Sequence, residues 1–114
     1  MLTNYTVRPE DSGMKILMNV KIPHQQFNAA TKDGSVRKKL KSILDAIKPE
    51  AVYFTEQSGQ RGAVLVVNIK DSSQIPSLAE PWFLTFEADV EFRIAMTPGD
   101  LQKGGLKELG EKWG

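Results

Sequence analysis

The chain has 114 residues, a length that suits one domain built around one hydrophobic core. Its 40% hydrophobic and 25% charged residues are typical of a folded globular protein, and 15 Lys and Arg against 14 Asp and Glu leave a net charge of +1. That balance favours neither nucleic acid nor an anionic membrane, so we expect neither as a partner. The absence of cysteine excludes disulfides, thiol nucleophiles and cysteine-ligated metals, and it agrees with a reducing, cytoplasmic location.

Residues 1–13 are interpreted as an N-terminal arm ahead of a single domain at 14–114. The arm is polar and carries Arg8, Glu10 and Asp11 where a signal peptide has an apolar run. No apolar stretch of 18 residues follows it. We therefore expect no export by a standard signal and no membrane-spanning segment.

The first half of the domain shows two kinds of hydrophobic periodicity. Apolar and polar side chains alternate over residues 14–22, which predicts a strand. Over residues 36–47 the apolar side chains recur at helical spacing on one side, which predicts a long helix. Residues 24–32 lie between them and predict a shorter helical segment that breaks near Asp33-Gly34.

The second half begins with two β-branched and aromatic runs, Ala51–Glu56 and Ala63–Ile69. They predict a hairpin whose strands are joined by the six residues between these runs. Residues 71–86 predict a second helix, which Pro81 should end or kink because it lacks the backbone N–H. Residues 88–96 alternate again and predict the last strand of the sheet.

The C-terminal residues predict one more helix. Thr97 to Asp100 have the form of a capping box with Pro98 at the first helical position. Apolar residues then follow at helical spacing, and Gly104-Gly105 should weaken the helix. The whole order of elements predicts an α+β domain of the ferredoxin-like βαββαβ type, with an antiparallel four-stranded sheet and an added C-terminal helix.

One face of this sheet needs a cover from outside the βαββαβ unit. Two helices cover one face of a four-stranded sheet, yet the strand at 63–69 is expected to be apolar on both faces. We place Leu65, Val67 and Ile69 on one face and Ala63, Val64 and Val66 on the other. Leu17 and one of Tyr53 or Phe54 also belong to the second face. The C-terminal helix could cover it, but a second copy of the chain is the favoured cover.

Three segments match the pattern of a known superfamily: Glu50–Val67 (EAVYFTEQSGQRGAVLVV), Leu78–Phe86 (LAEPWFLTF) and Phe92–Pro98 (FRIAMTP). They resemble the dimeric α/β-barrel superfamily, and more closely small bacterial proteins of that type with no settled function. The resemblance implies ferredoxin-like protomers that pair through their sheets as a homodimer or higher homo-oligomer. The superfamily includes muconolactone isomerase-like enzymes, cofactor-free monooxygenases, haem-degrading enzymes and members without known activity. It therefore implies a fold and not a reaction.

Four polar side chains are expected to converge on the second face of the sheet. Asn19 and Lys21 come from the first strand, and Glu91 and Arg93 come from the last strand, which should lie beside it. This combination predicts a pocket that fixes the carboxylate or carbonyl of a small metabolite. The alternative hypothesis is an ion pairing at the sheet edge, where charges commonly prevent aggregation.

Two further side chains are weaker candidates for a ligand site. His24 is the only histidine and could act as a base near neutral pH, but no partner residue is identifiable, which favours a surface histidine. Trp82 could line a cavity, although aromatic residues at its spacing are more often core. The haem-degrading members of the superfamily use an Asn, a Trp and a His. Asn19 and Trp82 suit that set, whereas His24 precedes the later helix that the resemblance requires, so we expect no haem.

The remaining motifs point to no cofactor. One histidine with scattered carboxylates has no metal-ligand spacing, and the glycines form no phosphate-binding loop. Three hypotheses for function stay open: a metabolite-binding protein, a non-catalytic assembly module, and a cofactor-free isomerase or monooxygenase-like enzyme. The residues do not decide between an enzyme and a binding protein.

Overall fold

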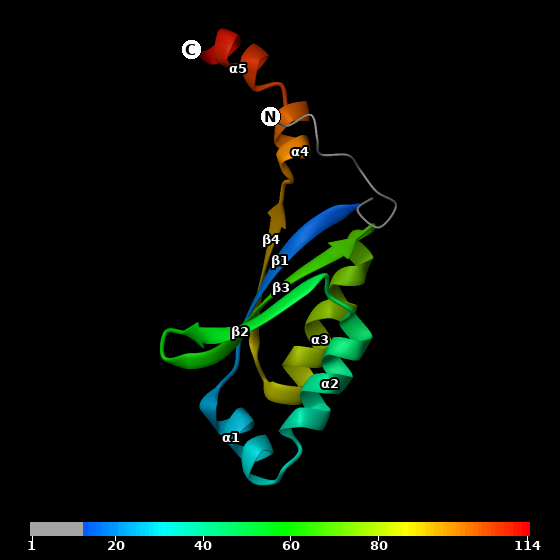
Figure 1. The fold of residues 1–114 in the computed structure, drawn as a ribbon, viewed down its shortest axis with the longest axis vertical. Helices are drawn as coiled ribbons and strands as arrows, with labels where there is room; N and C mark the ends of the chain where they lie inside the picture. Colours follow the sequence, from blue (N-terminus) through cyan, green and yellow to red (C-terminus); the bar gives the residue numbers. More distant parts are fainter. Residues whose placement is uncertain (1–12) are drawn as a thin grey trace.

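The computed structural model describes residues 13–114, so the expected N-terminal arm lies outside the described residues except for Gly13. The chain forms a mixed α+β domain with an open, antiparallel, four-stranded sheet (Figure 1). The strands lie in the order β2-β3-β1-β4. In chain order the elements are β1 (Met14–Lys21), α1 (His24–Lys32), α2 (Val36–Ile47), β2 (Ala51–Gln57), β3 (Gln60–Ile69), the 3-10 turn η2 (Ser72–Gln74), α3 (Ile75–Phe86), β4 (Asp89–Ala95), α4 (Pro98–Lys103) and α5 (Leu106–Trp113).

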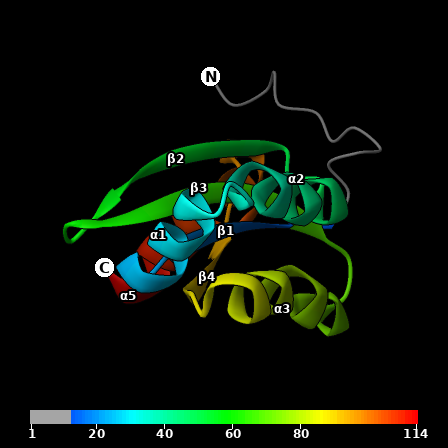
Figure 2. The same ribbon diagram turned by 90° about the horizontal axis from the view of Figure 1, so that it is seen from below.

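The hydrophobic core lies between one face of the sheet and the helices α2 and α3, which sit on the same side of it (Figures 1 and 2). Alternate side chains of the two central strands supply the sheet side of this core because successive residues of a strand point to opposite faces. The buried strand residues are Ile16, Met18, Val20, Ala63, Leu65, Val67 and Ile69. The helices contribute Ile43, Leu78, Ala79, Trp82 and Phe86.

The first two helices follow the sequence pattern closely. Both α1 and α2 have the predicted bounds, and the chain breaks between them at Asp33-Gly34. The Asp33 carboxylate accepts a hydrogen bond from the backbone N–H of Ser35 at 2.9 Å, which stabilises the break. Hydrogen bonding from the side chain and the backbone of Ser35 lowers the pKa of Asp33. Helix α1 closes one end of the core, where the Phe27 ring stacks on Phe86 with 5.8 Å between centroids.

The hairpin of β2 and β3 is tighter than its hydrophobic runs predict. Pairing continues through Gln57 and Gln60, so the connection is the two residues Ser58 and Gly59 and not six. Both have positive φ angles, 52° and 78°, which is the backbone geometry of a type I′ turn. The predicted loop was too long because polar strand ends carry no hydrophobic signal, although the backbone ladder still extends through them.

Helix α3 corrects a second expectation. Asp71 caps the turn ahead of it and accepts a hydrogen bond from Ser73 N–H at 2.8 Å. The helix then runs through Pro81 to Phe86, so Pro81 does not end it, and of the two predicted effects only a kink stays a prediction. Trp82 and Phe86 lie one helical turn apart, and both are fully buried, with 6.5 Å between their ring centroids. Burial of two large aromatic side chains outweighs the loss of one backbone hydrogen bond.

Within residues 13–114, no helix lies over the second face of the sheet (Figures 1 and 2). Val64 and Val66 lie on that face, but Ala63 does not: it is fully buried on the same side as Leu65. The expectation that grouped Ala63 with Val64 and Val66 is therefore wrong, because strand neighbours alternate in direction. We call this side the uncovered face.

The C-terminal residues 96–114 form an arm that leaves the end of β4 and projects away from the domain (Figure 1). The predicted capping box is present: Asp100 N–H donates to the Thr97 hydroxyl at 3.1 Å, and Thr97 N–H donates to the Asp100 carboxylate at 3.0 Å. The helix is broken at Gly105, which has a φ of 74°. Neither α4 nor α5 has a buried residue, so the arm does not cover the uncovered face.

Candidate functional site

The strand register determines which side chains meet on the uncovered face. Leu17 lies opposite Val66 on one side and Arg93 on the other, and Asn19 lies between Val64 and Glu91. Directly opposed residues of antiparallel strands project to the same face with Cβ atoms about 4.5–5.5 Å apart. The side chains on the uncovered face therefore divide into an apolar part and a polar part.

The apolar part lies over β2, β3 and the middle of β1. Its members share a face because Ala51 pairs with Val66 and Tyr53 pairs with Val64. They are Leu17, Ala51, Tyr53, Val64 and Val66. Tyr53 is 71% exposed, while Leu17, Val64 and Val66 are half-buried by their neighbours within the sheet. A contiguous apolar surface of this kind is unusual on a soluble monomer.

The polar part lies over β1 and β4 and contains the four predicted residues. Glu91 is directly opposite Asn19, and Lys21 and Arg93 lie two residues along their strands, on opposite sides of this pair. The sequence missed a fifth member, Asp89, which lies opposite Lys21. Its alternation with Glu91 and Arg93 placed it on the correct face, but only the register shows which residue it opposes. We call Asn19, Lys21, Asp89, Glu91 and Arg93 the polar cluster.

The charges of the polar cluster have no fixed partners within the part of the chain that the structure describes. Lys21, Glu91 and Arg93 make no side-chain hydrogen bond or ion pair with another described residue. The other end of the uncovered face is different, because the Lys15 ammonium contacts both carboxylate oxygens of Glu50, at 2.8 and 2.9 Å. The Asn68 amide also donates to Glu50, at 3.4 Å. The face thus holds an ion pair at the Lys15 end, whereas the two cations and two carboxylates of the polar cluster are not joined by ion pairs within residues 13–114.

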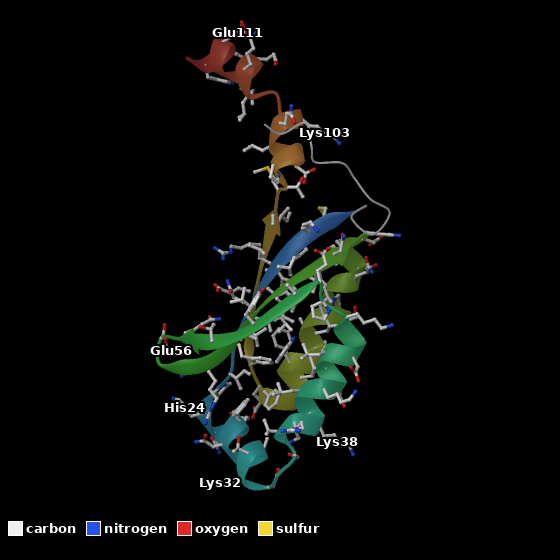
Figure 3. All side chains as sticks on the ribbon, viewed as in Figure 1. His24, Lys32, Lys38, Glu56, Lys103 and Glu111 are labelled. Carbon is white, nitrogen blue, oxygen red and sulfur yellow. The ribbon has the colours of Figure 1, made fainter. Side chains whose placement is uncertain are left out.

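The other two sequence candidates lie apart from the polar cluster. His24 begins α1, beyond the end of β1, and is exposed (Figure 3). Trp82 is fully buried against the opposite face of the sheet, among the core residues. Its indole N–H has no hydrogen-bond partner within residues 13–114. The structure therefore brings together the four strand residues and separates them from His24 and Trp82.

The described residues contain few alternatives for chemistry. No group of three or more His, Cys, Asp or Glu side chains in residues 13–114 could hold a metal ion. No helix in that range is long and apolar enough to cross a bilayer. The polar cluster combines two cations, two carboxylates and one amide, and each cation can donate a charge-assisted hydrogen bond to a carboxylate or a carbonyl.

Comparison of the sequence with protein-family models and with curated proteins found no match. Among solved structures, the chain is similar to one described as "De novo designed protein Ferredog-Diesel", with a TM-score of 0.42 and 8% sequence identity. The similarity covers 78% of this chain and 93% of that chain.

Proposed function

We propose that this chain is a ferredoxin-like protomer that forms a homodimer through its uncovered face and binds a small anionic or carbonyl metabolite at the polar cluster. The observation that carries the proposal is the uncovered face itself, which joins an apolar surface to a polar cluster whose two cations, Lys21 and Arg93, form no ion pair within residues 13–114. The strand order β2-β3-β1-β4 supports the ferredoxin-like assignment.

The apolar part supplies the reason to dimerise. Half-buried Leu17, Val64 and Val66 sit in the two central strands, with exposed Tyr53 at the edge. Removal of such side chains from water contributes roughly 25 cal/mol per Å² of apolar area. A second copy presents the same surface, and two-fold symmetry makes a self-complementary interface the commonest solution.

The polar part supplies the reason to bind a ligand. Lys21 and Arg93 are donors that approach from neighbouring strands, and the Asn19 amide lies between them. A facing sheet would exclude water from this region and lower the local dielectric, which strengthens a hydrogen bond to a charged group. Glu91 opposes the binding of polyanions and accepts a hydrogen bond from a hydroxyl or amine of the ligand. We therefore propose a monoanion that also carries a hydrogen-bond donor, such as a hydroxy or amino carboxylate.

A second candidate function is a non-catalytic assembly module. It is supported by the balance of charge in the polar cluster, where Lys21 and Arg93 are matched by Asp89 and Glu91. In a symmetric interface these four side chains could pair across the two copies without a ligand. Both candidate functions include the homodimer. They differ only in the group that pairs with Lys21 and Arg93, which is a ligand in the first and a carboxylate of the second copy in the other.

Native mass spectrometry of freshly purified protein tests both parts of the proposal. We expect a mass of two chains, plus a small molecule that is released on denaturation. A dimer without retained mass that also fails to bind any of a panel of hydroxy and amino carboxylates supports the assembly module. A monomer, confirmed by sedimentation at micromolar concentration, contradicts the proposal as a whole.

A further inference from the structure

The two edge strands of the sheet differ in how well they are protected against pairing with another strand. Strand β4 carries a charge at every second residue, Asp89, Glu91 and Arg93, and such charges commonly keep an edge strand from pairing. The charge of β2, Glu56, lies beside the turn, and its carboxylate accepts a hydrogen bond from the Gly59 N–H. No helix of residues 13–114 runs along the outer side of β2 (Figure 2). The β2 edge is therefore the open one.

The backbone of β2 has hydrogen-bonding groups that point away from the sheet. The Arg61 carbonyl accepts a hydrogen bond from the Ile22 N–H at 2.9 Å, so the Arg61 backbone is directed toward the β1 side. Neighbouring residues of an antiparallel ladder bond to opposite sides, so Gly62 is directed toward β2, where Thr55 lies opposite. Thr55 is in turn directed toward β3. The even-numbered residues of β2 therefore direct their N–H and C=O groups outward, namely Val52, Phe54 and Glu56.

Both faces of β2 also carry an aromatic side chain that the described part of the chain leaves in water. Tyr53 is 71% exposed on the uncovered face. Phe54 is 53% exposed and projects to the covered face, because it lies opposite the buried Ala63. An exposed edge strand that is apolar on both faces is a template for a further strand.

A second copy of β2 is complementary to this edge. A two-fold axis perpendicular to the sheet pairs two β2 strands antiparallel and keeps each side chain on its own face. With Tyr53 on the axis, the two Tyr53 side chains lie opposite each other, and Val52 of each copy lies opposite Phe54 of the other. Aromatic pairs and pairs of an aromatic with a β-branched residue are favourable across strands. Both Val52–Phe54 pairs then exchange hydrogen bonds through outward-directed backbone groups.

The neighbouring register is less favourable. With Phe54 on the axis, the outward-directed residues still match, but Val52 lies opposite Glu56 of the second copy. That arrangement places a carboxylate against an apolar side chain twice, once for each copy. The side chains therefore select the axis through Tyr53.

We propose that β2 pairs with β2 of a second copy about a two-fold axis through Tyr53, which joins two four-stranded sheets into one continuous sheet. This pairing does not depend on the face-to-face dimer, because it uses the edge of the sheet. Five opposed residues give an edge about 17 Å long and about 10 Å thick, far below the roughly 800 Å² per partner of a stable interface. The edge contact therefore forms at high protein concentration and joins face-to-face dimers into assemblies of four chains.

Disulfide trapping tests the register, since a chain without cysteine allows single thiols to be introduced cleanly. Chains with Val52→Cys mixed with chains with Phe54→Cys should form a disulfide-linked heterodimer under mild oxidation, because the Cα atoms of a hydrogen-bonded pair lie about 5.5 Å apart. Both positions belong to the covered face, so a face-to-face dimer does not bring them together. The control, Thr55→Cys mixed with Phe54→Cys, should form no heterodimer. A disulfide between two Phe54→Cys chains would overturn the proposed register.

Sedimentation velocity at micromolar and near-millimolar concentrations measures the association itself. The wild type should change from two chains to four as the concentration rises. Phe54→Lys should weaken this second association roughly tenfold, because an edge lysine opposes strand pairing and symmetry removes both Val52–Phe54 pairs. The matched control Ile94→Lys places the same charge on the other edge strand, where Ile94 is 71% exposed, and should leave the association unchanged.

The outcomes separate the edge contact from the face-to-face dimer. If the dimer persists, no larger species forms and no Val52–Phe54 disulfide appears, the edge pairing is wrong and the face-to-face dimer stands. If Phe54→Lys abolishes the dimer at micromolar concentration while Val66→Lys leaves it intact, the edge pairing stands and the face-to-face dimer is wrong. Loss of the larger species in Ile94→Lys alone would assign the pairing to β4 and overturn the proposal.

Discussion

The two faces of the sheet are built from the same strands but differ in what completes them. On the covered face, Met18 and Leu65 are fully buried beneath α2 and α3 of the same chain. On the uncovered face, their strand neighbours Leu17 and Val66 are only half-buried, and no helix among the described residues lies over them (Figure 1). The covered face thus supplies the core of the fold, and the uncovered face is the surface at which we propose that a partner and a ligand bind. The following predictions separate these two roles.

The largest contrast comes from two adjacent valines of β3. Val67 is buried on the covered face, so Val67→Lys should lower the free energy of unfolding by about 3–5 kcal/mol, the cost of an uncompensated buried charge. Val66→Lys places the same charge on the uncovered face, where it should leave a folded monomer. Urea unfolding and sedimentation velocity measure the two effects. Equal destabilisation of both variants would show that the faces do not differ as proposed.

The next effect concerns the polar cluster. Lys21→Met and Arg93→Met should each weaken the binding of a hydroxy or amino carboxylate about tenfold to a hundredfold, because each removes a charge-assisted hydrogen bond that contributes about 1.5–3 kcal/mol. Isothermal calorimetry measures this change. Unaltered binding in both variants would place the ligand elsewhere.

The end of the uncovered face that holds the Lys15–Glu50 ion pair provides the matched control for that experiment. Lys15→Met breaks the ion pair with Glu50, and it should lower the free energy of unfolding by about 1 kcal/mol or less because the pair is partly exposed. It should not affect carboxylate binding, since the Lys15 ammonium is already paired with the Glu50 carboxylate. A loss of binding as large as that of Lys21→Met would extend the site across the whole face.

The smallest effect lies away from both faces, at the cap ahead of α3. Hydrogen bonds from Ser73 lower the pKa of Asp71. A carboxyl with a lowered pKa in the folded state contributes stability that is complete above its unfolded pKa and is lost as the pH falls through the folded value. Asp71→Asn keeps the capping oxygen and removes the titration. The free energy of unfolding, measured with urea between pH 5 and about pH 2, should therefore fall less steeply with decreasing pH in this variant than in the wild type.

Much of the fold could be predicted because its signals are local. The bounds of α2 follow from one amphipathic stripe, and the cap at Thr97 follows from four consecutive residues. The errors arose where a distant contact prevails over a local preference. Pro81 stays within α3 because Trp82 and Phe86 are anchored in the core, and that anchoring is not visible in the helix's own residues.

The candidate site could be predicted only in part for a related reason. Alternation along β1 and β4 placed Asn19, Lys21, Glu91 and Arg93 on one face, which the structure bears out. The pairing of Asp89 with Lys21 depends on register, which no single strand encodes. The role of these residues in binding remains a prediction.

The proline inside α3 has a consequence for the motions of the folded protein. Pro81 has no amide proton, so the carbonyl of Ser77 lacks the donor that continues a regular helical ladder. Helix α3 is therefore divided into two segments of unequal protection against amide hydrogen exchange. We expect local opening only in the first turn, residues 75–77, because Leu78 and Ala79 are buried in the core and the last turn is held by the rings of Trp82 and Phe86.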